Sequence, residues 1–164
     1  MRVRRRVRSV GVCVAAATVL VASPASYALL QSCSVSASGV SFGPYDPSSS
    51  QANTATGTVT VSCSVTLIGL LASWTLSLSP GSSASYTSRS LVNGASTLQY
   101  NLFNTPSYST VWGNGSGATG VVSDGAPLLI GNNSYTYTVY GRIPPLQDVR
   151  TGSYSDSIVV TIDY

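Results

Sequence analysis

The side chains that usually carry enzymatic chemistry are scarce in this sequence. Its 164 residues include no His, Lys or Glu, and its acidic residues are five scattered aspartates, Asp46, Asp124, Asp148, Asp156 and Asp163. General acid–base catalysis usually falls to His or to paired carboxylates. The sequence therefore predicts no catalytic site and a protein that is not an enzyme.

Most of these aspartates have simpler expected roles. Asp46 and Asp124 stand in Asp-Pro and Asp-Gly turn sequences, where Asp commonly caps the local backbone. We expect Asp156 at the solvated start of the last strand. Asp163 should lie on the outer face of that strand, where a charge discourages random edge pairing.

The N-terminus has the pattern of an export signal. Arg2 to Arg8 form a positive region, Val10 to Ala22 a short apolar stretch, and Ser26-Tyr27-Ala28 offers small residues at the positions that signal peptidase reads. We predict a secretory signal over residues 1–28 and a single mature domain over residues 29–164. The apolar run is too short for a bilayer-spanning anchor, so no membrane span is expected.

The predicted signal cleavage also determines which cysteines remain in the mature chain. Cys13 would leave with the signal, so the mature chain keeps Cys33 and Cys63, which we expect to form one disulfide. On the chain-entropy model, closing a loop of about 30 residues stabilises a fold by about 3–4 kcal/mol. Two distant cysteines without any His do not make a zinc site, so neither metal nor cofactor is expected.

The net charge of +3 comes from the signal segment. Five of the eight Arg lie in the first eight residues, which leaves three Arg against five Asp, a formal charge of −2, in the remainder. Nucleic-acid binding depends on basic surface. The mature chain therefore offers no electrostatic case for nucleic acid as a partner.

The composition favours a β-structure. Ser, Thr, Val, Gly and Tyr are abundant, 43% of residues are hydrophobic and 8% are charged, a composition suited to strands and tight turns. Alternating patterns predict short strands over 32–38, 56–65, 73–79, 97–103, 119–122, 134–142 and 154–164. Gly-, Pro- and Asn-rich pairs separate them, including Asn93-Gly94 and Asp124-Gly125. We predict one immunoglobulin-like antiparallel β-sandwich.

The last predicted strand is the most apolar. It places Ile158, Val160, Ile162 and Tyr164 on one face, and the sequence supplies no further strand beside it. An open apolar edge invites pairing with another chain. We therefore expect a sandwich that lacks its final strand and has an open groove lined by these four side chains.

Two apolar stretches fall where polar loops would be expected, Leu67 to Ala72 and Ala126 to Ile130. One interpretation is that they are strand ends tucked into the core. The other is that they project as apolar fingers that contact a surface. The candidate adhesive residues are Leu67, Ile68, Leu70, Leu71, Leu128, Leu129 and Ile130.

Several stretches from Cys33 onward carry a family resemblance. They are Phe42-Gly-Pro-Tyr-Asp-Pro47, Gly57-Thr-Val-Thr-Val-Ser-Cys63, Leu78-Ser-Pro-Gly81, Leu98-Gln-Tyr-Asn-Leu102, Val111-Trp-Gly-Asn-Gly115, Val139-Tyr-Gly-Arg-Ile143 and Gly152-Ser-Tyr-Ser-Asp-Ser157. In this order, over about 130 residues, the chain resembles the spore coat protein U domain family, the subunits of archaic (Csu-type) chaperone–usher pili.

The resemblance implies a mode of assembly. Subunits of this family are immunoglobulin-like sandwiches without a final strand. A periplasmic chaperone first fills the groove, and the N-terminal extension of a neighbouring pilin subunit replaces it at the outer-membrane usher. The Cys33–Cys63 pair corresponds to the family's usual bridge. The implied route is export through the periplasm to a pilus or coat on the cell surface.

One feature departs from the rod-forming subunits. The predicted mature sequence before Cys33 is only Leu29-Leu-Gln-Ser32, and four residues span at most about 14 Å. Such a subunit could accept a donor strand but not give one, which favours a tip position and contact with hydrophobic or host surfaces. Tip adhesins of the family usually have two domains, whereas one is expected here. The alternative is a self-complete, single-domain spore or outer-surface coat protein whose own N-terminal region or a hairpin fills the groove.

Overall fold

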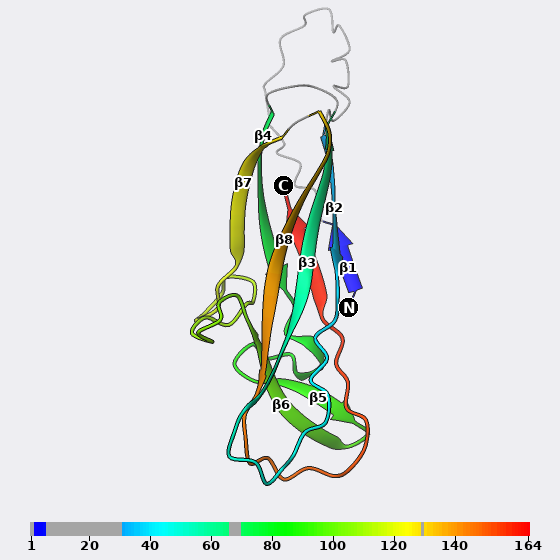
Figure 1. Cartoon of the computed structure of the whole chain (residues 1–164), viewed down its shortest axis with the longest axis vertical. Helices are drawn as coiled ribbons and strands as arrows, with labels where there is room; N and C mark the ends of the chain where they lie inside the picture. Colours follow the sequence, from blue (N-terminus) through cyan, green and yellow to red (C-terminus); the bar gives the residue numbers. More distant parts are fainter. Residues whose placement is uncertain (1, 6–30, 66–69, 129) are drawn as a thin grey trace, which may run out of the picture.

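A computed structural model describes residues 2–5, 31–65, 70–128 and 130–164. Its strands form two packed sheets (Figure 1). The four-stranded sheet has the order β1 (Arg2–Arg5), β9 (Val159–Asp163), β4 (Leu70–Leu78) and β7 (Val122–Leu128). The five-stranded sheet has the order β2 (Gln31–Ala37), β3 (Asn53–Val65), β8 (Gly131–Ile143), β6 (Ser96–Phe103) and β5 (Arg89–Asn93). A single 3-10 turn, η1 (Gly81–Ser83), follows β4 within these ranges.

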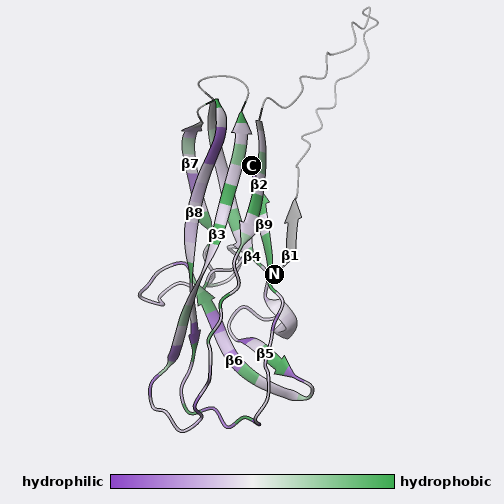
Figure 2. Cartoon of the chain, turned by 45° about the vertical axis from the view of Figure 1, so that its right-hand side comes forward, coloured by the Kyte–Doolittle hydropathy of each residue, from purple (hydrophilic) through white to green (hydrophobic). Residues whose placement is uncertain are grey.

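The period-two pattern builds the core. On β3 the buried residues Val59, Val61, Cys63 and Val65 alternate with outward Thr and Ser, and Figure 2 shows this alternation along the strand. Trp74 of β4 and the facing side chains of β9 complete the interior. The predicted all-β, immunoglobulin-like sandwich is thus confirmed. Among the described residues, no helix is long and apolar enough to cross a membrane.

The disulfide joins neighbouring strands of one sheet. Cys33 on β2 is the register partner of Cys63 on β3, and their sulfur atoms are bonded, with 4.1 Å between the Cα atoms. This confirms the predicted pair. The predicted cleavage site and the Leu29–Leu30 stub lie outside the described residues, so the domain boundary stays a prediction.

Two predictions about strands and turns were wrong. The expected strand over 119–122 is absent: Gly120 makes a single bridge to Trp112, and Val122 is the first residue of β7. The expected Asp124-Gly125 turn lies inside β7, paired with β4. Glycine suits this position because a Cβ on Gly125 would lie 3.0 Å from the Ala72 carbonyl oxygen. Asp124 accepts hydrogen bonds from the Gly125 amide at 2.7 Å and from the Tyr137 hydroxyl at 2.9 Å, so it caps the local backbone as expected, but within a strand and not in a turn.

The ends of other elements also differ from expectation. The last strand is shorter than 154–164, because residues 154–158 make one bridge, from Ser155 to Val92 of β5, before β9 begins. Strand β5 was not predicted, since its sequence Arg-Ser-Leu-Val-Asn does not alternate. Its register with β6 instead follows from the tight Asn93-Gly94 connection, where Gly94 has a φ of 58°.

Candidate functional site: the groove beside β9

The two edges of the four-stranded sheet differ in their capacity to pair. Edge strand β7 contains Asp124, Gly125 and Pro127, which weaken or block further pairing. Strand β9 contains neither Pro nor Gly. It pairs with β4 on one side and, on the other, in parallel with β1, from Arg2 opposite Val159 to Arg5 opposite Ile162. The edge of β9 away from β4 therefore admits an added strand.

The predicted groove residues lie along this strand. Ile158, Val160 and Ile162 are 7%, 0% and 1% exposed, and Tyr164 is half-buried. The first three belong to the sandwich core. Their alternation gives β9 an apolar inner face, which any strand added at its edge would extend.

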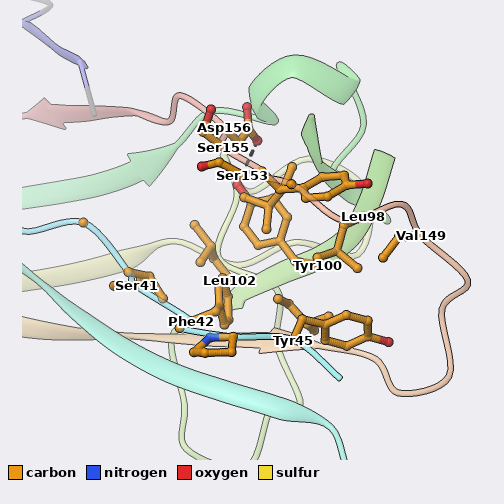
Figure 3. A pocket seen from close by; sticks show the side chains of 18 of the residues that line it. Ser41, Phe42, Tyr45, Leu98, Tyr100, Leu102, Val149, Ser153, Ser155 and Asp156 are labelled. Atoms are coloured by element: carbon orange, nitrogen blue, oxygen red, sulfur yellow. Dashed lines mark hydrogen bonds between the residues drawn. The ribbon is translucent and has the colours of Figure 1, made fainter. Parts of the chain in front are cut away.

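A hollow of about 830 Å³ continues from the start of β9. One wall is the segment 38–47 after β2, and the other is the segment 149–156 before β9 (Figure 3). Its apolar floor consists of Leu98, Tyr100, Leu102, Val139, Ile143 and Ile158. Sheet interiors of this kind are normally covered by another strand or chain segment, so the hollow is a place where apolar side chains could insert.

The first wall lies flat on the sheet because two facing positions have no side chain. A Cβ on Gly141 would come within 2.7 Å of Val40 and Phe42, and a Cβ on Gly57 within 3.0 Å of the Ser38 carbonyl oxygen. Larger residues would push this segment off β3 and β8. The wall also has an aromatic contact, since the rings of Phe42 and Tyr100 meet edge to face at 5.9 Å.

The second wall is held by hydrogen bonds at its inner end. Ser155 exchanges two backbone hydrogen bonds with Val92 of β5. Asp156 accepts from the Ser82 amide at 2.9 Å, the Ser82 hydroxyl at 2.6 Å, the Ser157 amide at 2.7 Å and the Tyr100 hydroxyl at 2.8 Å. Asp156 is therefore a half-buried anchor of the wall, contrary to the expected solvated strand start.

The electrostatics of the hollow do not favour proton transfer. Burial, followed by the hydrogen bond to Asp156, raises the pKa of the Tyr100 hydroxyl well above its ordinary value of 10. The Asp156 carboxylate is already engaged by four donors. The arrangement suits binding of apolar side chains along an extended backbone.

The candidate adhesive residues that the structure describes lie at the opposite end from the hollow. Leu70 is the register partner of Leu128, and Val65 the partner of Gly131, so the start of β4 lies beside the end of β7, and the end of β3 beside the start of β8. Leu70, Leu71 and Leu128 belong to strands β4 and β7, which corrects their assignment to loops. Leu67, Ile68 and Leu129 lie outside the described residues.

One candidate side chain is plainly available at that end. Ile130 is 58% exposed and lies between β7 and β8. The pairing of Leu70 with Leu128 brings the start of β4 and the end of β7 together at this pole of the molecule.

Reasoning from periodicity predicted the strands that supply most of the floor of the hollow but did not identify the hollow or its walls. Residues 98–102, 139–143, 42–47 and 152–157 were singled out for their family resemblance, and each supplies lining residues. Segments 98–102 and 139–143 fall largely within strands predicted from alternation, whereas the Gly, Pro and Tyr content of 42–47 and 152–157 breaks the strand pattern, so alternation alone could not identify these two. The irregular, aromatic composition of 42–47 and 152–157 was the available signal.

Comparison with known proteins places this geometry in context. The family model described as "Spore Coat Protein U domain" matches residues 16–161. Protein U of Myxococcus xanthus is 32% identical over 135 residues, which cover 76% of this chain and 71% of that protein.

A solved structure shares the fold. It is the chaperone–tip adhesion subunit pre-assembly complex from the archaic chaperone–usher Csu pili of Acinetobacter baumannii, with 20% sequence identity and a TM-score of 0.56. The match covers 82% of this chain but spans only 40% of the matched chain.

Proposed function

The chain belongs to the spore coat protein U domain family, and from this premise we propose that it is an exported structural subunit of a chaperone–usher pilus or surface coat. It assembles by accepting a strand from another molecule. Its role is structural and adhesive, not enzymatic. The proposed mature domain is residues 29–164, after removal of the signal in residues 1–28.

The observation that carries this proposal is the continuous acceptor surface along one side of the sandwich. The β9 edge takes an added strand in the register seen with β1, and the hollow beyond Ile158 extends the apolar surface. In strand addition the backbone hydrogen bonds supply affinity, and pockets for alternate side chains supply fit. The edge and the hollow supply these two parts.

The proposed partners follow from the same surface. A periplasmic chaperone would fill the groove first, and a neighbouring subunit would replace it at an outer-membrane usher. The structural neighbour from Acinetobacter baumannii is itself a chaperone–subunit complex, which supports a chaperone as the first partner. The route leads through the periplasm to the cell surface.

We place the subunit at the tip of its fibre. Strand β2 begins at Gln31 and pairs at once with Val65 of β3. With cleavage after Ala28, only Leu29 and Leu30 would remain outside this strand. Such a subunit accepts a donor strand and cannot supply one, and its apolar end around Ile130 would contact hydrophobic or host surfaces.

The test is complementation of residues 29–164 by a donor. Co-expression with a chaperone of this pilus class should yield a one-to-one complex. A synthetic peptide of about ten residues with alternating Val and Thr should raise the melting temperature of the isolated domain, since a ligand at 100 times its Kd stabilises by about 2.7 kcal/mol. A stable monomer that neither peptide nor chaperone affects would refute strand acceptance.

One observation favours the second candidate, a self-complete surface coat protein. The chain's own Arg2–Arg5 segment occupies the β9 edge in the structure. In this case the full chain would be stable alone and unresponsive to the peptide. Mass spectrometry of the exported protein decides whether this segment persists: an intact N-terminus supports self-completion, and cleavage after Ala28 removes it.

A further inference from the structure

The outer face of the five-stranded sheet carries a regular array of hydroxyl groups. Every second residue is Ser or Thr from Ser32 to Ser36 on β2, from Thr54 to Ser64 on β3 and from Ser134 to Thr138 on β8. All are exposed apart from the half-buried Thr60. Figure 1 shows β2, β3 and β8 side by side along the long axis.

The register of the strands aligns these hydroxyls in rows. Ser36 lies opposite Thr60, and Thr60 opposite Thr136, with 3.1 Å between the hydroxyl oxygens of the two threonines. Neighbouring rows are about 6.8 Å apart along a strand, and neighbouring strands about 4.8 Å apart. Each hydroxyl can both donate and accept a hydrogen bond. The array is therefore an uncharged surface on which every side chain offers a donor and an acceptor.

An aromatic cluster adjoins the array on the same face. Tyr140 follows Thr138 at the next outward position of β8 and is the register partner of Phe103 on β6. The Tyr108 ring contacts both, edge to face, at 5.4 Å from Phe103 and 6.5 Å from Tyr140. All three rings are half-buried, and the exposed Arg142 guanidinium lies 5.6 Å from the centre of the Tyr108 ring.

The backbone of Tyr108 has an uncommon conformation, which Ala84 and Leu146 share. Its φ is 54°, in the left-handed region that a bulky residue seldom adopts. The turn that holds it is closed by the Tyr108 amide donating to the Thr105 carbonyl at 3.2 Å. Strained residues of this kind concentrate at binding sites, where the surrounding structure maintains them.

We propose that this face, from the hydroxyl rows to the Phe103–Tyr108–Tyr140 cluster, binds an extended saccharide chain. Saccharide hydroxyls donate and accept as the Ser and Thr hydroxyls do, and the C–H faces of sugar rings pack on aromatic side chains. The exposed guanidinium of Arg142 would pair with the carboxylate of a uronic acid residue. The site faces away from the hollow, whose floor uses the inward residues Val139 and Ile143. Saccharide binding can therefore be tested independently of strand acceptance.

The experiment is calorimetric titration of the full chain with an oligogalacturonate and with a cello-oligosaccharide. Tyr140→Ala should weaken binding about two- to tenfold, the range that a single aromatic contact supplies. Thr56→Val and Thr138→Val remove hydroxyls beside Tyr140 with little change of shape. Thr75→Val on β4 is the matched control, because Thr75 bonds Ser123 on the other sheet and should not alter binding.

The two probes distinguish an acidic saccharide chain from a neutral one. Binding of the oligogalacturonate alone, weakened by Arg142→Gln, indicates an acidic chain. Binding of both, unaffected by Arg142→Gln, indicates a neutral one. No binding of either probe refutes the proposal, as does binding that 0.5 M salt abolishes and that Tyr140→Ala leaves unchanged, since that is nonspecific ion attraction.

Discussion

At the scale of single residues, Arg89 is the least expected feature. Its side chain is fully buried, and it donates to the Ser79 carbonyl at 2.9 and 3.1 Å, the Trp112 carbonyl at 2.8 Å and the Asn101 amide oxygen at 2.7 Å. Burial lowers the pKa of the guanidinium. The cation thus ties the end of β4 and the loop that carries Trp112 to the β5–β6 hairpin.

Replacing this cation should be severely destabilising. Arg89→Met would fill similar volume but leave the Ser79 and Trp112 carbonyl oxygens without their Arg89 donors, each costing about 1–3 kcal/mol, and would remove one of the two donors to the Asn101 amide oxygen. We expect a loss of at least about 3 kcal/mol in the free energy of unfolding, measured by denaturant titration. Arg150→Met is the exposed control and should stay within about 0.5 kcal/mol of the parent. Equal effects of the two changes would contradict the assigned role.

Tyr100 and Tyr137 should make the fold sensitive to alkali. Burial raises both pKa values above the ordinary value of 10, that of Tyr137 to about 12. Above pH 10 the unfolded chain releases these protons while the folded chain retains them, so stability is full below pH 10 and falls as pH rises. Tyr100→Phe should cost about 1.5–3 kcal/mol at pH 8 through the lost bond to Asp156.

The same variant tests the cause of the alkaline decline. With one tyrosine of raised pKa removed, the stability of Tyr100→Phe should fall less steeply than that of the parent between pH 10 and 11.5. Denaturant titrations at intervals of half a pH unit measure this. Parallel curves for the two proteins would show that Tyr100 does not contribute.

At the scale of elements, the segments beside the hollow decide whether it can accept a strand. Val149 is half-buried in the second wall, whereas Leu146, on the same connection, is 64% exposed. Val149→Asp should weaken binding of the alternating Val–Thr peptide at least about tenfold, because a carboxylate would oppose apolar side chains there.

Leu146→Asp is the matched control for that change. It adds the same charge three residues away, outside the hollow, and should leave peptide binding within about twofold of the parent. Fluorescence-detected peptide titration gives both values. Equal weakening by the two substitutions would indicate a general charge effect and remove the hollow from the acceptor surface.

The elements also show where prediction from sequence stops. Strand β3 was recognisable because its outward Thr and inward Val alternate without interruption. Strand β5 and the walls at 38–47 and 149–156 follow no such period. Their positions depend on contacts with distant residues, such as Val92 with Ser155 and Phe42 with Gly141. Local pattern does not carry that information.

At the scale of the whole molecule, the two exposed large apolar side chains found among the described residues lie at opposite poles. Ile130 precedes β8 and Leu146 follows it, and β8 runs along the long axis of the sandwich (Figure 1). If adhesion depends on the pole at which β7 ends and β8 begins, substitution of Ile130 should weaken adhesion and substitution of Leu146 should not.

Substituting each residue with Ser tests this polarity. Ile130→Ser should reduce adsorption of the full chain to polystyrene, because a buried Ile contributes about 1.5–3 kcal/mol at most. Leu146→Ser should leave adsorption unchanged. Adsorption isotherms on the same plastic measure both. A larger effect of Leu146→Ser would place the contacting surface at the other pole.

The sequence by itself determined the all-β class, the Cys33–Cys63 pair and the apolar inner face of β9, because composition, cysteine number and period two are local properties. The tertiary structure decided the rest. It placed Asp124 inside β7, buried Arg89 among carbonyls and turned Leu70 and Leu128 from expected loop residues into strand partners. Each of these outcomes depends on which distant segments meet, and long-range pairing is set by the packing of the whole sandwich.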